Sequence, residues 1–96
     1  MVDGKQVVTQ EFIVKDPSIA GGAPTIKGTR IRVSDIVIEF EYWGKTPDDI
    51  IRAHPHLSLA QVHAALAYYY EHVAEIKAEI SSNETIVSEL KQKLSH

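Results

Sequence analysis

The chain of 96 residues contains no cysteine, which excludes disulfide bonds and thiolate metal ligands and is typical of a reducing compartment. It also has no apolar run near the roughly 20 residues that a membrane-spanning helix needs. Residues 1–10, MVDGKQVVTQ, lack the basic and apolar regions of a signal peptide and are polar enough to be flexible. These absences predict a single-domain cytoplasmic protein that does not enter a membrane.

Groups that carry enzyme chemistry are scarce as well. His54 and His56 flank Pro55, and His63 follows, but no cysteine or suitably spaced carboxylate completes a metal site. Serine, histidine and aspartate occur without a local pattern that would join a nucleophile to its base, and so short a chain has little room for a dry pocket. We therefore expect no enzymatic activity and no metal or other cofactor.

The stretch GGAPTIKGTRI, residues 21–31, is close to a phosphate-binding loop in which lysine and glycine have exchanged places. A P-loop needs consecutive backbone N–H donors, a lysine after its second glycine and a helix that starts at once. Here Pro24 removes one donor, Lys27 precedes Gly28, and a strand-like segment follows. The stretch is instead interpreted as a turn whose glycines allow positive φ angles.

The net charge of −3 argues against nucleic-acid binding over the whole surface, but the charge is unevenly distributed. Beyond Tyr70 the acids outnumber the lysines, whereas residues 15–32 contain a single acid, Asp16. The cations in that basic stretch are Lys15, Lys27, Arg30 and Arg32. A basic front and an acidic back indicate two different partners, with solvated surface as the alternative for either half.

Two short β-rich segments, residues 11–16 and 25–33, flank a run of turn formers and predict a β-hairpin or a pair of arms. The second of them is expected to be kinked at its glycine. A helix is expected over residues 34–43, with Ser34 as its N-cap and Gly44 just after its end. The stripe that this helix is predicted to bury comprises Val33, Ile36, Val37, Phe40 and Trp43.

A short second helix is expected to open at Thr46, where a cap is followed by proline and two acids. The third helix begins with a capping box of Ser58 and Gln61. Apolar residues at steps of three and four then continue to Leu94, with Asn83 as the polar interruption. This pattern predicts either an unusually long third helix or, if the segment around Asn83 is a break, a separate amphipathic helix at the end.

Together these elements predict a mainly α protein with a short N-terminal β-hairpin or arm, a three-helix domain of the helix-turn-helix kind, and a C-terminal amphipathic helical extension. The expected organisation is a flexible segment at residues 1–10, the β-arm with the helical domain at 11–72, and a partner-binding or coiled-coil helix at 73–96.

In a helix-turn-helix the first residues of the second helix face base edges, and cations hold the phosphates. The residues predicted to bind DNA are Lys27, Arg30, Arg32, Ser58, Gln61 and His63. The residues predicted to bind a protein partner or a second copy of the chain are Ile76, Ile80, Val87, Leu90 and Leu94. Two alternatives stay open for the basic residues, namely contact with a protein partner and contact with acidic neighbours alone.

Three segments, DPSIAGGAPTIKGTRIRVSDIV, GKTPDDII and HPHLSLAQVHAALAYY, resemble a bacterial and archaeal family of small antitoxin-like proteins. The family was long filed as domain of unknown function four hundred and thirty-three, and the resemblance covers roughly Ile13 to Ile80. It implies a helical domain of the homeodomain-like or winged-helix kind, usually dimeric, with an N-terminal β element. Arg32 stands where many members have proline, and residues 81–96 extend beyond the common domain.

The resemblance also implies a VapB-type antitoxin that blocks the metal-dependent site of a small PIN-like ribonuclease toxin and represses the shared operon. We accordingly predict a homodimeric antitoxin of a type II toxin-antitoxin pair, with operator DNA and the toxin as its partners. One alternative is a stand-alone helix-turn-helix transcriptional regulator that is dimerised by its C-terminal helix. Another is a structural dimer or adaptor that binds neither DNA nor a ribonuclease.

Overall fold

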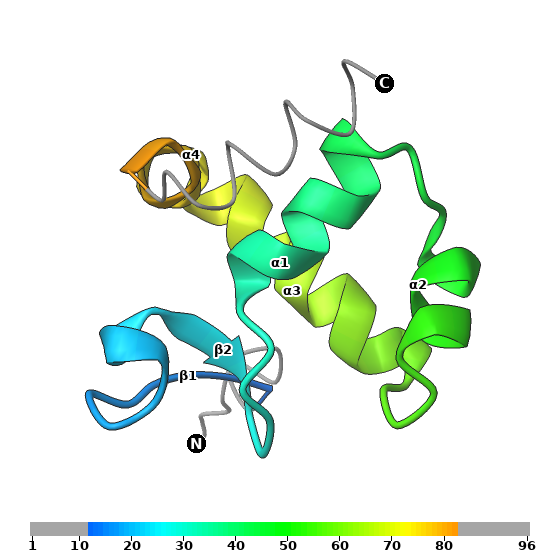
Figure 1. Ribbon diagram of the computed structural model, residues 1–96, viewed down its shortest axis with the longest axis horizontal. Helices are drawn as coiled ribbons and strands as arrows, with labels where there is room; N and C mark the ends of the chain where they lie inside the picture. The colour runs from blue at the N-terminus through cyan, green and yellow to red at the C-terminus, as the bar shows by residue number, and fades with distance from the viewer. Residues whose placement is uncertain (1–11, 83–96) are drawn as a thin grey trace, which may run out of the picture.

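The computed structural model describes residues 12–82 of the chain, and this part is mainly helical with a short N-terminal pair of strands (Figure 1). The predicted fold class is therefore confirmed. The elements in chain order are β1 (Ile13–Lys15), the 3-10 turn η2 (Ala20–Gly22), β2 (Pro24–Ile26), α1 (Val33–Val37), the π-helical turn η3 (Ile38–Tyr42), α2 (Pro47–Ala53), α3 (Leu59–Glu71) and α4 (Val73–Ser82). Among the described residues, no helix is long and apolar enough to cross a membrane.

Strands β1 and β2 pair antiparallel, with Ile13 opposite Ile26. A two-stranded sheet is marginal by itself in water, and here β2 packs against both α1 and α3. The second strand is shorter than predicted. It ends at Ile26 and does not continue past Gly28. Beyond that point the chain makes a turn, and only an isolated bridge between Thr25 and Arg32 continues the pairing.

Helix α1 starts earlier than predicted, because its first residue is Val33 and its N-cap is Arg32, two positions before Ser34. The Arg32 backbone N–H donates to the side chain of Asp35 at 3.0 Å, which satisfies a donor at the helix start. Ser34 is buried instead, and its hydroxyl donates to Glu79 Oε2 at 2.7 Å. The sequence pattern alone favoured serine because serine is a common N-cap, but tertiary contacts use this serine elsewhere.

The predicted stripe of the first helix is confirmed at Val33, Ile36 and Val37, which are fully buried, but Trp43 is 40% exposed. The cause is the change from α1 to the π-helical turn η3. In that turn the Trp43 N–H donates to the carbonyl of Ile38, five residues earlier, at 3.0 Å. A π turn contains more residues than an α turn, so the stripe drifts and Trp43 leaves the buried face.

Helices α2 and α3 begin as predicted. Thr46 and Asp49 form a reciprocal capping box at the start of α2, and Ser58 and Gln61 form one at the start of α3. Hydrogen bonds from the Thr46 backbone N–H and from Arg52 hold the pKa of Asp49 below its usual value, which keeps the cap ionised.

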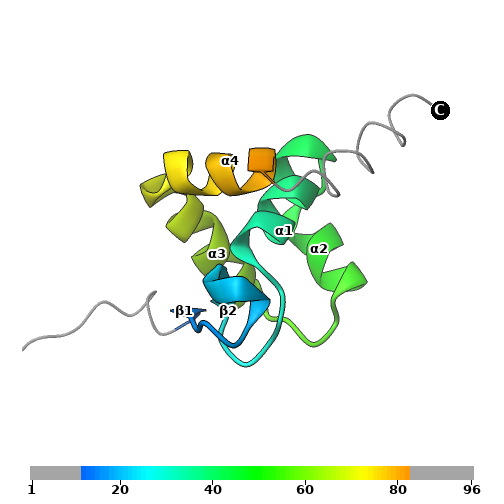
Figure 2. The ribbon, with the colours of Figure 1, turned by 60° about the vertical axis from the view of Figure 1, so that its left-hand side comes forward.

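The third helix does not run unbroken to the chain end. It stops at His72, whose φ of −136° and ψ of 44° are not helical, and α4 starts in a new direction. The His72 ring stacks on Tyr68 with 4.1 Å between ring centroids, and its Nδ1 lies 3.0 Å from the Tyr68 carbonyl oxygen. Figure 2 shows α4 crossing above α3 and beside α1. The break lies well before Asn83, which is outside the described residues.

The core gathers one face from each helix and from the two strands. The buried apolar residues that form it are Ile13, Ile26, Val33, Ile36, Val37, Ile38, Ile50, Leu57, Val62, Ala64, Ala65, Leu66, Tyr69, Ile76 and Ile80. Helix α4 therefore belongs to the same core as α1 and α3, and it is part of the domain that the strands and helices build.

Candidate nucleic-acid and partner surfaces

Helices α2 and α3 are joined by the turn at residues 54–58, and both α1 and α2 pack against α3. This is the arrangement of elements expected of a helix-turn-helix with its supporting first helix. The connection at residues 27–32 and the turn at 54–58 project toward the same end of the molecule in both views (Figures 1 and 2). The structure thus brings the basic stretch and the start of α3 to one end of the domain.

Lys27 and Arg30 lie on the turn at residues 27–30 and are exposed. No ion pair joins either of them to another residue in the described part of the chain. The turn itself is held firmly by Thr29, whose hydroxyl donates to the Ile26 carbonyl at 2.8 Å and accepts from the Ile31 N–H at 3.0 Å. The two cations therefore project from a fixed turn into solvent.

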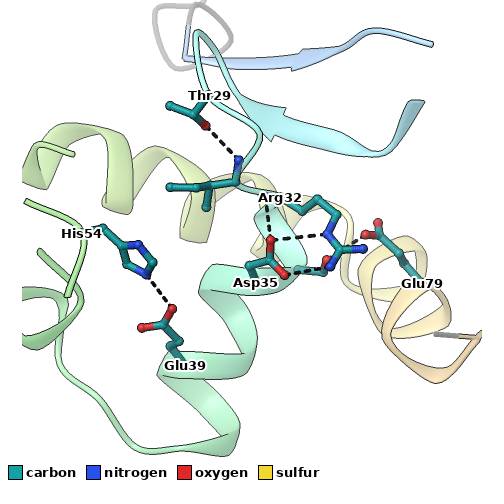
Figure 3. A network of polar contacts seen from close by, with 8 residues as sticks. Thr29, Arg32, Asp35, Glu39, His54 and Glu79 are labelled. Carbon is teal, nitrogen blue, oxygen red and sulfur yellow. Dashed lines mark hydrogen bonds and ion pairs between the residues drawn. The ribbon is translucent and has the colours of Figure 1, made fainter. Parts of the chain in front are cut away.

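Arg32 has a different role from the other two basic residues. Its Nη2 lies 3.1 Å from Asp35 Oδ1 and its Nε lies 3.3 Å from Oδ2, so the guanidinium and the carboxylate pair through two bonds (Figure 3). The side chain is only 27% exposed. Arg32 thus fixes the start of α1, which reduces its availability for a phosphate.

The side chains of Ser58 and Gln61 each accept a hydrogen bond from the backbone N–H of the other at the start of α3. The Ser58 N–H donates to Gln61 Oε1 at 2.8 Å, and the Gln61 N–H donates to Ser58 Oγ at 3.2 Å. Both side-chain oxygens are therefore engaged in capping. His63 is exposed but lies farther along α3, at an apolar groove that it lines with Phe40, Pro47, Leu66, Ala67 and Tyr70. Of the predicted DNA-binding set, Lys27 and Arg30 are the most available.

Ile76 and Ile80, which the sequence predicted to bind a partner or a second copy of the chain, are 0% and 3% exposed. Their side chains fill the core between α4 and α1. The break at His72 explains this, because it turns α4 back onto α1 and directs its apolar face inward. Val87, Leu90 and Leu94, the other residues predicted to bind a partner, lie outside the described residues.

Three tertiary polar contacts were not predictable from local patterns. Ser34 and Glu79 meet across 45 positions of sequence, and the Tyr69 hydroxyl donates to Glu41 Oε1 at 2.8 Å across 28. Burial, and then the bond to Glu41, raise the pKa of Tyr69 to about 12. The third contact joins Glu39 to His54, across 15 positions. The pair of Arg32 and Asp35 could have been found, because its spacing of three is that of a capping box.

The model of the family described as "Protein of unknown function (DUF433)" matches residues 13–69, which is more than half of the chain. A crystal structure of a DUF433 member protein from Anabaena variabilis is similar, with 27% sequence identity and a TM-score of 0.67. The similarity covers 77% of this chain and 72% of that one. No match was found among curated proteins. The chain belongs to the DUF433 family.

Proposed function

We propose that this protein is the antitoxin of a type II toxin-antitoxin pair, acting in the cytoplasm as a homodimer. It neutralises a small PIN-like ribonuclease and binds the DNA of its own operator. The observation that supports the DNA half is that the turn at residues 27–30, which contains the exposed Lys27 and Arg30, lies at the same end of the domain as the turn that leads into α3. The toxin half rests on the resemblance to antitoxin-like proteins and on the apolar pattern of Val87, Leu90 and Leu94.

The charge distribution supports separate roles for the turn at residues 27–30 and for helix α3 in the proposed DNA binding. Helix α3 contains no lysine or arginine, so phosphate contacts would have to come from other elements, and the exposed Lys27 and Arg30 on the turn at residues 27–30 are suited to this. Arg52 is a further cation, in the last turn of α2 just before the turn at residues 54–58, and its side chain is 72% exposed although it pairs with Asp49. A surface of this kind binds phosphate with little discrimination among bases, so specificity would come from the start of α3 and from the spacing of two copies in a dimer.

Co-expression with any small ribonuclease found to be encoded beside this gene tests the toxin half. We expect the full chain to co-purify with the ribonuclease and to abolish its RNA cleavage. A chain shortened to residues 1–82 keeps the whole described domain, and we expect it to lose neutralisation while keeping its melting temperature. Neutralisation that survives the truncation would show that the C-terminal segment is not the inhibitor, and absence of any such ribonuclease activity would remove the antitoxin proposal.

The second candidate is a stand-alone helix-turn-helix regulator that is dimerised by its C-terminal helix. The same placement of the turn at residues 27–30 supports it, because DNA binding by this end of the domain would not require a toxin. Gel-shift titration with the DNA upstream of the gene, at several salt concentrations, separates the two proposals when combined with the ribonuclease assay. Operator binding without neutralisation supports the regulator, and both activities together support the antitoxin.

A further inference from the structure

A cavity of about 280 Å³ lies between α1 with η3 and the start of the turn after α2. Figure 3 labels four of its lining residues, Arg32, Asp35, Glu39 and His54. The DNA-binding and toxin-binding proposals do not use this cavity. Its lining residues are Ile31, Arg32, Asp35, Ile38, Glu39, Trp43 and His54. Sites for whole small-molecule ligands usually have about 300–1,000 Å³, so this cavity has the size for one small group or one side chain.

Two carboxylates lie on the wall that the helix contributes. Asp35 and Glu39 are four residues apart, which places them on one face of the helical segment. Asp35 is already neutralised, because Arg32 pairs with both of its oxygens. Glu39 is therefore the carboxylate of the lining whose charge favours a cation over an anion in the cavity.

Glu39 is 8% exposed, and its two oxygens differ. Oε2 accepts a hydrogen bond from His54 Nε2 at 2.7 Å, which connects the helix to the residue that ends α2 (Figure 3). Oε1 is buried and has no hydrogen-bond partner among the described residues. Lys45 Nζ lies 3.6 Å from Oε1, which is close enough for electrostatic attraction but too far for a good hydrogen bond. A buried acceptor without a donor costs free energy, so a donor brought to this carboxylate is stabilising.

The apolar part of the lining is also suited to a cation. Lys45 Nζ lies 5.5 Å from the centroid of the Trp43 ring, so the face of this ring already attracts positive charge. Ile31 and Ile38 provide walls for an aliphatic stem. Within the lining, Arg32 and Asp35 cancel and Glu39 carries the remaining negative charge, which Lys45 offsets in part from 3.6 Å.

We propose that this cavity binds a guanidinium group, whose planar fork of donors fits a carboxylate flanked by an aromatic ring. The group would add donors to the Glu39 carboxylate and stack its stem against the apolar walls. The chemistry is the same for a free guanidino compound and for an arginine side chain of a partner protein. The proposal is independent of the antitoxin function, because it rests on the cavity and on Glu39.

Tryptophan fluorescence tests the proposal cleanly, since Trp43 is the only tryptophan of the chain and lines the cavity. The probe is N-acetyl-arginine amide, and its control is N-acetyl-citrulline amide, which has nearly the same shape without the charge. We expect a saturable change with the arginine compound and none with the citrulline compound. Equal responses to both compounds, or no saturable response to the arginine compound, overturn the proposal without any variant being needed.

Variants then assign the binding to Glu39. Glu39→Gln is expected to weaken the association about tenfold or more, because a hydrogen bond to a charged acceptor is lost. Glu71→Gln is the matched control, since Glu71 is exposed and its side chain has no ion pair with another described residue. Unchanged binding in Glu39→Gln, or equal weakening in both variants, contradicts the assignment.

A cavity-filling variant covers the case in which Glu39→Gln does not fold. Ile31→Phe keeps both carboxylates but occupies the space, so it is expected to abolish binding of the arginine compound. Binding that persists in Ile31→Phe places the site elsewhere. A short unstructured peptide with one internal arginine distinguishes the two sources of the group. Binding of the peptide as tightly as the amide indicates a protein side chain, and binding of the amide alone indicates a free compound.

Discussion

The turn at residues 27–30 and helix α4 differ in where their characteristic side chains lie, in solvent for the turn and in the core for the apolar residues of α4. The turn directs Lys27 and Arg30 into solvent on a backbone that Thr29 holds in place. Helix α4 directs Ile76 and Ile80 into the core, where almost none of their surface is exposed. The turn has charge available for a partner at little cost to stability, whereas the apolar residues of α4 already contribute to folding.

This difference separates binding from stability within one small domain. Removing an exposed cation leaves the core intact, so its effect should be on association and should depend on salt. Removing a buried apolar group leaves a cavity, so its effect should be on the free energy of unfolding. Substitutions in the two regions should therefore change different measured quantities.

The largest expected effect is that of Ile76→Ala in α4. Ile76 is fully buried, so its truncation should lower the free energy of unfolding by about 3 kcal/mol. Val73→Ala is the matched control on the same helix, because Val73 is 38% exposed and should change the value by less than about 0.5 kcal/mol. Urea unfolding monitored by circular dichroism measures both. Equal and small effects would mean that α4 is not docked in the core.

The next effect concerns the turn, and it rests on the proposed DNA binding. The double variant Lys27→Ala with Arg30→Ala should weaken binding to upstream DNA about tenfold or more at moderate salt. It should also reduce the slope of log K against log salt by about 2, because each of the two cations would no longer neutralise a phosphate. Lys77→Ala, an exposed lysine on α4, should change neither quantity. Gel-shift titration measures both, and an unaltered salt slope would exclude the turn from the interface.

The starts of α2 and α3 could be predicted from sequence because capping is local. Thr46 with Asp49 and Ser58 with Gln61 each lie within four consecutive residues, and their side chains have few other partners. The start of α1 could not be predicted by the same rule. Ser34 has the right chemistry for a cap, but its partner Glu79 comes from α4, and the path that brings α4 there depends on the whole core.

The candidate sites show the same limit. The exposure of Lys27 and Arg30 follows from a glycine-containing turn in a polar stretch, so it could be predicted. The inward face of α4 could not, because steps of three and four look the same whether the apolar face meets a partner or its own core. The cavity beside Glu39 depends on the π turn and on His54 from another element, and neither leaves a local signal in the sequence.

Two adjacent tyrosines on α3, buried Tyr69 and exposed Tyr70, should differ in how they affect the pH dependence of the free energy of unfolding. The pKa of Tyr69 is raised to about 12, whereas an unfolded tyrosine titrates near about 10. Between these values the unfolded chain has lost this proton and the folded chain retains it. The contribution of protonated Tyr69 to the free energy of unfolding is therefore complete below about pH 10. It decreases as pH rises and is lost as pH passes about 12.

We expect Tyr69→Phe to remove the Tyr69 contribution to the fall in the free energy of unfolding between about pH 10 and pH 12. The variant should also lower the free energy of unfolding at neutral pH by about 1 kcal/mol, because the hydrogen bond to Glu41 is lost. Tyr70→Phe, which changes a 58% exposed neighbour, should keep the decrease. Both variants retain Lys15 and Tyr68, whose pKa values are also raised, so the difference between the two isolates Tyr69. Urea unfolding over pH 9–12 measures it, and identical profiles would contradict the assignment.

An effect of similar size but opposite sign, a gain in stability, is expected beside the turn, at Thr25 in the middle of β2. Thr25 is fully buried, and its hydroxyl has no hydrogen-bond partner within the described part of the chain. Thr25→Val removes that unsatisfied group at nearly constant shape and suits a strand, so we expect the free energy of unfolding to rise by about 1 kcal/mol. DNA affinity should not change, because both cations and their turn are retained.

The same substitution four residues later should act in the opposite direction. The Thr29 hydroxyl makes two hydrogen bonds that close the turn, so Thr29→Val should lower the free energy of unfolding by about 1 kcal/mol and also weaken DNA binding by loosening Lys27 and Arg30. Parallel urea unfolding and gel-shift titration of the two variants measure both quantities. If Thr25→Val also weakened DNA binding, the strand would be part of the interface, and the division between a binding turn and a structural scaffold would be wrong at this point.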